Sequence, residues 1–363
     1  MSEPICIQAA HAFKLNIPLK TEFAVAYASY DRVETIVASV GADNGVVGWG
    51  SASPDEEVTG ETVESTFKAL TEKIGPALME AQSAPPARLL RVVFNAAPEA
   101  PAARAAADIA IHDLWSKSIG CSLSSLLGAY RTTIPTSVTI GICDESETLE
   151  RARAFIDRGF SILKIKCGKN ADEDIARVKK LRETIGEKVK LRLDANQGYS
   201  LDDARKAAAA LAPENIEFIE QPTAAKDREA LVALATESPI PVMADESALD
   251  AKDALELFQA GVPLVNIKLM KCGGVREALR ICDIALTLGK KVMIGCMDEL
   301  PLSMAAAAAV ALAHPAVAYA DLDGHIDLEQ RVAAGGIIID TGFVSVTERP
   351  GLGVEIRKQY LKE

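Results

Sequence analysis

The sequence has little of what marks secreted or membrane-spanning proteins. Its seven cysteines are odd in number and dispersed, without a Cys-x-x-Cys pair, which is typical of reduced thiols rather than of a disulfide framework. The longest apolar stretch, 304–313, is too short to span a bilayer. The N-terminus has no basic segment followed by an apolar core, so no signal peptide is expected. We therefore expect a cytoplasmic protein with no membrane partner.

Positive charge is also in deficit. The 39 Lys and Arg residues against 51 Asp and Glu give a net charge of −12, which argues against nucleic acid or an anionic membrane as the main partner. The content of 49% hydrophobic and 25% charged residues is that of an ordinary globular protein. A chain of 363 residues then suggests a large domain with a smaller one, or an α/β barrel with additions.

What the sequence does contain is a repeated pattern from residue 135 onward. Short runs rich in Val, Ile and Leu alternate with segments of helical period, and the ends of the runs lie 23 to 30 residues apart. An open doubly wound sheet gathers its ligand-binding residues at one switch point, whereas a barrel places them at the carboxyl ends of many strands. We therefore predict a TIM-like (β/α)7-8 barrel. The residues at the run ends are Thr139, Lys164, Asp194, Glu220, Asp245, Lys268, Cys296 and Asp321.

The flanking regions do not follow this pattern. Residues 36–53 predict a hairpin with its turn at 43–45, and helices are expected over 60–79 and 101–119. Short β-like pieces return after residue 326. We predict an α+β capping domain over 1–125, a barrel over 126–325, and a C-terminal segment, 326–363, that rejoins the cap. Within the barrel, Ser146 and Ser200 are expected to begin helices.

Three carboxylates at consecutive strand ends, Asp194, Glu220 and Asp245, predict a metal site. Oxygen donors without His or Cys suit Mg²⁺, or Mn²⁺, and three converging buried anions would be costly without a cation. We expect one Mg²⁺ per subunit. The alternative is that each acid caps a loop or pairs with a surface lysine.

Lys166 and Lys268 are the candidate acid and base. They lie on the second and sixth strands, on opposite sides of a closed ring, as a 1,1-proton transfer at one carbon requires. Lys164 shares the face of Lys166, and we expect its charge to lower the pKa of Lys166. The alternative is that these lysines cap strand ends with extended stems.

Removal of a proton next to a carboxylate gives an enediolate, which a metal ion would stabilise. Asp321 and Asp323, at the eighth strand, suit a substrate cation such as an α-ammonium group, or form a solvated acid pair. Cys296 and Asp298 are expected to line the same pocket, although a structural role for Cys296 is equally open.

Six motifs together resemble the enolase superfamily, and within it the muconate-lactonising subgroup, over essentially the whole chain. The resemblance implies the barrel, the capping domain, Mg²⁺ and the two lysine bases. These motifs are Lys164-Ile165-Lys166, Asp194-Ala195-Asn196-Gln197-Gly198-Tyr199, Ile219-Glu220-Gln221-Pro222, Ala244-Asp245-Glu246-Ser247, Asn266-Ile267-Lys268 and Lys271-Cys272-Gly273-Gly274.

Asp321-x-Asp323 is similar to the motif with which dipeptide epimerases hold the free ammonium group of the substrate. The resemblance implies a dipeptide whose C-terminal carboxylate binds Mg²⁺ and whose α-carbon lies between Lys166 and Lys268. It also places Thr139, Lys164, Cys296 and Asp298 in the substrate pocket, and a homo-oligomer is expected. The first capping loop, 23–30, lacks the arginine expected for a glutamate side chain. The side-chain preference is therefore open, and a small or apolar residue is at least as well suited.

Two other functions compete with this interpretation. Muconate cycloisomerase, o-succinylbenzoate synthase and N-acylamino acid racemase share the lysines and the metal acids, but have no ammonium group to bind. A non-catalytic barrel would tolerate loss of the bases or ligands, yet all five positions are occupied.

Overall fold

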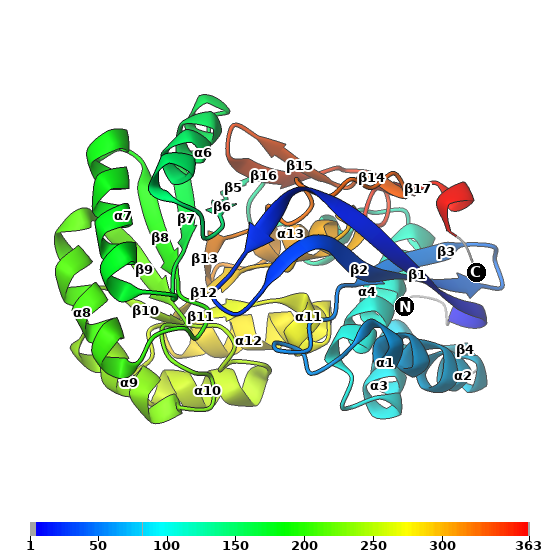
Figure 1. Ribbon diagram of the computed structural model, residues 1–363. Coiled ribbons are helices and arrows are strands. Elements are labelled where there is room, and N and C mark those ends of the chain that lie inside the picture. The colour runs from blue at the N-terminus through cyan, green and yellow to red at the C-terminus, as the bar shows by residue number, and fades with distance from the viewer. Residues whose placement is uncertain (1–4, 82, 362–363) are drawn as a thin grey trace.

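The computed structural model describes residues 5–81 and 83–361, and its largest sheet is built from the predicted apolar runs (Figure 1). Eight parallel strands follow one another in chain order, and the sheet curls until Thr136, just before the first of them, bridges to Ala320 in the last. This arrangement confirms the predicted barrel. The strands are β6 (Val138–Ile140), β7 (Ile162–Lys166), β8 (Lys190–Asp194), β9 (Ile216–Glu220), β10 (Val242–Ala244), β11 (Leu264–Ile267), β12 (Lys291–Ile294) and β13 (Val317–Ala320).

Helices between the strands cover the outside of the barrel, which explains why the strands are buried on both faces. Ser200 caps α8 as predicted, whereas the cap of α6 is Asp144, two residues before Ser146, because the side chain of Asp144 accepts a hydrogen bond from the Glu147 amide. The covering helices are α6 (Glu145–Asp157), α7 (Ala171–Ile185), α8 (Leu201–Leu211), α9 (Arg228–Glu237), α10 (Ala251–Gln259), α11 (Leu269–Cys272), α12 (Val275–Thr287) and α13 (Pro301–Ala313).

The N-terminal region forms a separate antiparallel sheet with helices packed on it. The predicted hairpin 36–53 is confirmed as part of β2 and β3, but the 20-residue β1 was not predicted, because most of it is only partly buried and shows no regular alternation. The sheet contains β1 (Ile5–Ala24), β2 (Ser29–Ala42), β3 (Val47–Ala52) and β4 (Ser83–Ala84). The helices are α1 (Val63–Lys68), η1 (Ala69–Ile74), α2 (Gly75–Glu80), α3 (Pro86–Ala96), α4 (Pro101–Ser118) and α5 (Leu123–Leu126).

The C-terminal segment contacts both units. Its strand β15 (Ile337–Asp340) pairs with β16 (Phe343–Val346), which pairs with β5 (Ile134–Pro135). β14 (Ala333–Gly335) pairs with β17 (Val354–Ile356), and η3 (Lys358–Tyr360) follows. The Leu352 amide donates to Asp113 of α4 at 2.8 Å. The exact boundaries of the three predicted domains stay a prediction.

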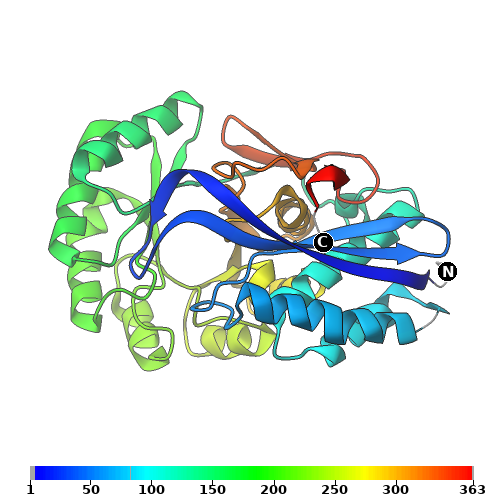
Figure 2. The same ribbon diagram turned by 45° about the vertical axis from the view of Figure 1, so that its right-hand side comes forward.

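The β1–β2 hairpin reaches from the cap across the mouth of the barrel (Figures 1 and 2). Its tip is held there by a hydrogen bond from the Ile142 amide, just after β6, to the Ala24 carbonyl at 2.8 Å. Two glycines allow this approach: a Cβ at Gly141 would lie 3.1 Å from Ala24 O, and one at Gly168 would meet Ala26 Cβ at 3.1 Å. The hairpin tip therefore forms a roof over the carboxyl ends of the strands.

No helix within residues 5–81 and 83–361 has both the length and the apolar character needed to cross a bilayer. All seven cysteines fall in these ranges and are free thiols, as expected.

The cap sheet depends on close contact between β3 and the alanine-rich α4. A Cβ at Gly50 would lie 2.1 Å from the Ala106 carbonyl oxygen. Gly50→Ala should therefore lower the free energy of unfolding by about 2 kcal/mol, because the strand and helix must move apart. Urea denaturation measures this change. Gly41→Ala, in β2, is the control, since its nearest contact would be an ordinary 3.5 Å to Ala9 Cβ. Equal stabilities of the two variants would contradict the prediction.

Candidate functional site

A cavity of about 620 Å³ lies between the cap and the carboxyl ends of the barrel strands. The cap contributes the hairpin tip and the loop that follows β3, and the barrel contributes strand ends from most of the ring. All of the predicted acid–base and substrate-binding residues line it, and the three predicted metal acids lie buried beneath it with 0% exposure. The predicted lining residues are Thr139, Lys164, Lys166, Lys268, Cys296, Asp298, Asp321 and Asp323.

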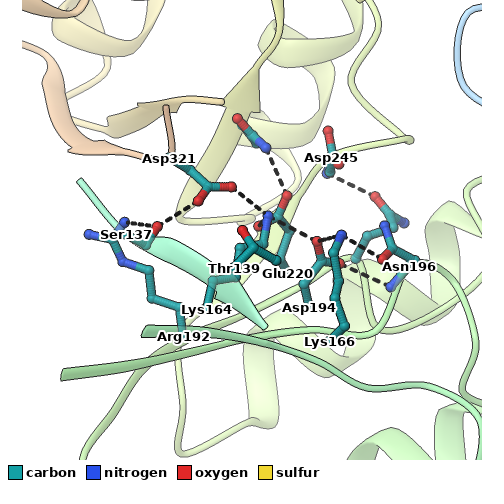
Figure 3. A network of polar contacts seen from close by, with 12 residues as sticks. Ser137, Thr139, Lys164, Lys166, Arg192, Asp194, Asn196, Glu220, Asp245 and Asp321 are labelled. Carbon is teal, nitrogen blue, oxygen red and sulfur yellow. Dashed lines mark hydrogen bonds and ion pairs between the residues drawn. The ribbon is translucent and has the colours of Figure 1, made fainter. Parts of the chain in front are cut away.

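Strand register brings the charged residues to one level. Lys166 of β7 is paired with Asp194 of β8, and Asp194 is paired with Glu220 of β9. Asp245 follows β10 directly, and its neighbour Ala244 pairs with Val265 of β11. The side chains therefore meet in one layer at the rim, as Figure 3 shows.

Lys164 lies at the centre of this layer. Its Nζ is 2.9 Å from Asp194 Oδ2, 2.9 Å from Glu220 Oε2 and 2.8 Å from Asp321 Oδ2. Burial alone would lower the pKa of Lys164, but the charges of these carboxylates outweigh it and raise the pKa well above its usual value. These contacts show that Lys164 is paired with three acids, and the expected effect of its charge on Lys166 stays a prediction.

The two candidate bases lie on opposite sides of the ring. Lys166 Nζ is 2.8 Å from both Asp194 Oδ2 and Asn196 Oδ1, and Lys268 Nζ is 2.8 Å from Asp245 Oδ2. Strands β8, β9 and β10 separate them in the sheet. Burial opposes the charge of Lys268, but Asp245 dominates and raises its pKa well above the usual value. Lys268 can act as a base only where the charge of Asp245 is otherwise compensated.

The three acids supply oxygen ligands of the kind that a hard cation prefers, although their oxygens do not surround one point. Within the described ranges, no three Asp, Glu, His or Cys side chains converge closely enough to hold a metal ion. However, Glu220 Oε2 and Asp245 Oδ2 are buried and accept no well-directed hydrogen bond, although a lysine Nζ lies near each. Burial and the charge of Asp194 raise the pKa of Glu220 to about 8. A divalent cation would relieve this repulsion.

Two further side chains that were not assigned roles from the sequence orient these acids. Asn266 Nδ2 donates to Glu220 Oε1 at 2.7 Å, and Lys271 Nζ contacts Asp245 Oδ1 at 2.5 Å. Asn266 lies two residues before Lys268, so its place on the same strand face is visible in the sequence. Lys271 follows one helical turn after Lys268, which alone does not reveal its partner.

The acid pair at the eighth strand is held by the first barrel strand. Ser137 Oγ donates to Asp321 Oδ1 at 2.6 Å, and the Thr139 amide donates to Asp323 Oδ2 at 2.6 Å. Burial and the neighbouring charge of Asp321 raise the pKa of Asp323 to about 7. Cys296 Sγ donates to the Asp321 carbonyl at 3.2 Å, so this thiol supports the loop besides lining the cavity.

Another part of the cavity lining is also acidic. Asp298 is half-buried and forms no hydrogen bond or ion pair with any residue in the described ranges, and its burial raises its pKa to about 6. Asp55, Glu56 and Glu57 of the cap line the same cavity. Arg32 also lines it, and pairs with Asp31 at 3.3 Å.

Two tyrosines of the cap complete this wall. Tyr27 and Tyr30 line the cavity, and Tyr30 Oη donates to Asp55 at 3.4 Å. The sequence resemblance pointed to the capping loop 23–30, which contains Tyr27 and Tyr30, but no cap residue was assigned a role in the site. No signal in the sequence joins residues 27–57 to a barrel loop near residue 298, because the docking of the cap determines that contact.

Comparison with known proteins agrees with this geometry. Residues 8–128 match the family described as "Mandelate racemase / muconate lactonizing enzyme, N-terminal domain", and residues 147–360 match "Enolase C-terminal domain-like". An L-Lys-D/L-Arg epimerase from Desulforapulum autotrophicum is 41% identical over 348 residues, which are 94% of this chain and 97% of that protein.

Two solved structures have nearly the same fold. A dipeptide epimerase from Enterococcus faecalis, complexed with Mg and L-Leu-L-Tyr, has a TM-score of 0.92 at 37% identity, covering 96% of this chain and 99% of that one. A dipeptide epimerase from Methylococcus capsulatus, complexed with Mg and L-Arg-D-Lys, has a TM-score of 0.91 at 40% identity, covering 97% and 100%. With both of its domains matched, the chain belongs to the mandelate racemase/muconate lactonizing enzyme family of the enolase superfamily.

Proposed function

We propose that the protein is a Mg²⁺-dependent dipeptide epimerase that inverts the α-carbon of the C-terminal residue. The observation that carries this function is the combination, in one cavity, of two lysines on opposite sides and a carboxylate pair at the eighth strand. The first feature suits proton transfer on two faces of one carbon, and the second suits a free ammonium group.

The lysines divide the proton transfer between them. With the substrate α-carbon between Lys166 and Lys268, one amine removes the α-proton and the protonated amine opposite returns a proton to the other face. Asp194, Glu220 and Asp245 would hold Mg²⁺, one ion per subunit, which supplies positive charge at the substrate carboxylate. Asn196 accepts a hydrogen bond from Lys166 Nζ, and so holds this amine toward the cavity.

Asp321 and Asp323 favour a dipeptide over the substrates of the related reactions. An N-acylated amino acid or a cycloisomerase substrate has no cation to compensate two buried carboxylates, whereas the N-terminus of a dipeptide has one. Both acids line the cavity and follow β13, which the Thr136–Ala320 bridge joins to the chain just before β6.

The acidic wall further favours a substrate with a basic side chain over one with small or apolar side chains. Asp298 is a half-buried carboxylate that forms no ion pair within residues 5–81 and 83–361. Asp55 with Tyr27 and Tyr30 forms an anionic and aromatic surface suited to an ammonium or guanidinium group. Basic dipeptides are also named for the relatives from Desulforapulum autotrophicum and Methylococcus capsulatus.

Homo-oligomeric assembly and a cytoplasmic location stay predictions.

Lys166→Ala and Lys268→Ala should each abolish epimerisation, by at least about 10²-fold, because one face loses its acid–base group. Each variant should still exchange the α-proton of one stereoisomer in ²H₂O with Mg²⁺, since the remaining lysine serves the other face. Proton NMR of L-Lys-L-Arg and L-Lys-D-Arg measures this, with excess EDTA as the control. Full activity in both variants would rule out the two-base mechanism.

Asp321→Asn should raise KM for dipeptides about tenfold, because a charge-assisted contact to the ammonium group is lost. Turnover of N-succinyl or N-acetyl amino acids should change less. Polarimetry with both substrate types gives the ratio. A larger loss with the N-acylated substrates would favour an N-acylamino acid racemase instead.

Asp298→Asn should lower kcat/KM for L-Lys-L-Arg at least about tenfold while leaving that for L-Leu-L-Tyr within about twofold, because the partner of the basic group loses its charge. Glu150→Gln on exposed α6 changes the net charge equally, away from the cavity, and serves as the control. Equal losses for both peptides would contradict the role of Asp298 in selecting a basic side chain.

A further inference from the structure

A buried arginine beneath the site leads to an inference about how Asp321 is held. Arg192 lies on β8, two residues before Asp194, so both side chains point into the barrel interior. Only 1% of Arg192 is exposed, and it is among the largest fully buried side chains. An apolar residue would fill this place without the cost of burying a charge. The guanidinium therefore needs an explanation beyond packing.

The partners of Arg192 lie on both sides of the barrel interior. Its Nε is 2.8 Å from Glu217 Oε2 on β9, and its Nη1 donates to Ser137 Oγ at 3.0 Å and to the Ala320 carbonyl at 2.7 Å. The rings of Phe218 and Tyr319 each lie 5.3 Å from its central carbon, which restricts the guanidinium plane. The side chain is thus fixed against strands on opposite sides of the ring.

The hydrogen-bond chain from Arg192 to Asp321 has a defined direction. A guanidinium can only donate, so Ser137 Oγ must accept from Arg192 and has one proton left to donate. Its near acceptor is Asp321 Oδ1 at 2.6 Å, while the Ala320 carbonyl is more distant at 3.4 Å. The serine hydroxyl is therefore polarised toward the carboxylate (Figure 3).

The second oxygen of the same carboxylate is held from the rim. Asp321 Oδ2 lies 2.8 Å from Lys164 Nζ, which also contacts Asp194 and Glu220. Ser137 below and Lys164 beside it therefore determine the plane of the Asp321 carboxylate. The lone pairs that remain, together with Asp323, face the cavity that both acids line.

We propose that Ser137 and Arg192 are positioning residues that orient Asp321 for the α-ammonium group of the substrate. This inference rests on the proposed function, since it assumes that Asp321 binds that group. It adds a chain of contacts, Arg192 to Ser137 to Asp321, that selects substrates with a free N-terminus without touching them.

A double-mutant cycle between Ser137 and Asp321 tests this coupling. Ser137→Ala removes one hydroxyl, and Arg192 keeps its bond to the Ala320 carbonyl, so the barrel floor is retained. In the otherwise native protein it should raise KM for L-Lys-L-Arg about tenfold with little change in kcat. In the Asp321→Ala background the same substitution should leave KM unchanged, because no carboxylate remains to orient.

Matched variants separate positioning from a general loss of structure. Ser116→Ala removes an equally buried hydroxyl in α4, whose bonds go to the His112 and Asp113 carbonyls, and it should not change KM. Ser137→Cys keeps the volume with a weaker donor and should give an intermediate KM. Arg192→Lys keeps the charge but loses the forked donors, and should resemble Ser137→Ala.

The outcomes distinguish this proposal from the proposed function. Equal effects of Ser137→Ala in both backgrounds, or no effect in the native background, would overturn the positioning role. An Asp321→Ala variant with native KM would instead contradict the ammonium site itself. Calorimetric Kd values for L-Lys-L-Arg and its N-acetylated form give the same cycle whether or not the peptide is turned over. Only the affinity for the free peptide should respond to Ser137→Ala.

Discussion

The ammonium group of Lys164 is the contact on which the charge balance of the site depends. It is within 2.9 Å of three carboxylates that come from β8, β9 and the end of β13. Without it, Glu220 and Asp321 would have no ion pair among the described residues, Asp194 would keep only Lys166, and the first two would tend to bind a proton. Lys164 thereby links the proposed metal acids to the proposed ammonium site, two regions that the strand order places far apart.

The other charged groups at the rim are paired in a similar way. Lys166 contacts Asp194, and Lys268, on the other side, contacts Asp245. Asn196 accepts a hydrogen bond from Lys166, while Asn266 and Lys271 contact the carboxylates of Glu220 and Asp245. Most of these polar atoms have fixed partners, so little reorganisation is needed when a substrate enters. Asp298 forms no ion pair or hydrogen bond with any of the residues that the structure describes, so its half-buried carboxylate would be stabilised by a cation.

The barrel and the acid–base residues could be predicted because their signals are local. Lys164, predicted at the end of an apolar run, lies in β7 (Ile162–Lys166), and the alternation of a strand places Lys164 and Lys166 on one face. Contacts between the beginning and the end of the barrel could not be predicted. The pairing of Ser137 with Asp321 joins residues 184 positions apart, and no periodicity encodes it.

Local rules also failed where two of them competed. Serine is a residue type that commonly caps helices, which is why Ser146 was expected to do so. Asp144 lies two residues earlier and accepts a hydrogen bond from the Glu147 amide at 2.8 Å, so it is the cap instead. β1 was not predicted because only one end of it packs on the cap helices. The other end extends over the barrel in contact with solvent, so the strand lacks a regular pattern of buried residues. The cap wall, with Tyr27, Tyr30 and Asp55, depends on that arch.

The roof formed by the β1–β2 tip has a consequence for how this family can diversify. The lysines proposed to transfer the proton lie at the ends of barrel strands, whereas part of the cavity lining comes from a hairpin and a loop more than a hundred residues earlier. Substitutions in that hairpin can therefore alter which peptide is accepted without disturbing the lysines or their acids. Substrate selectivity and catalysis thus depend on different segments of the chain, and a new substrate preference can arise while the reaction itself is conserved.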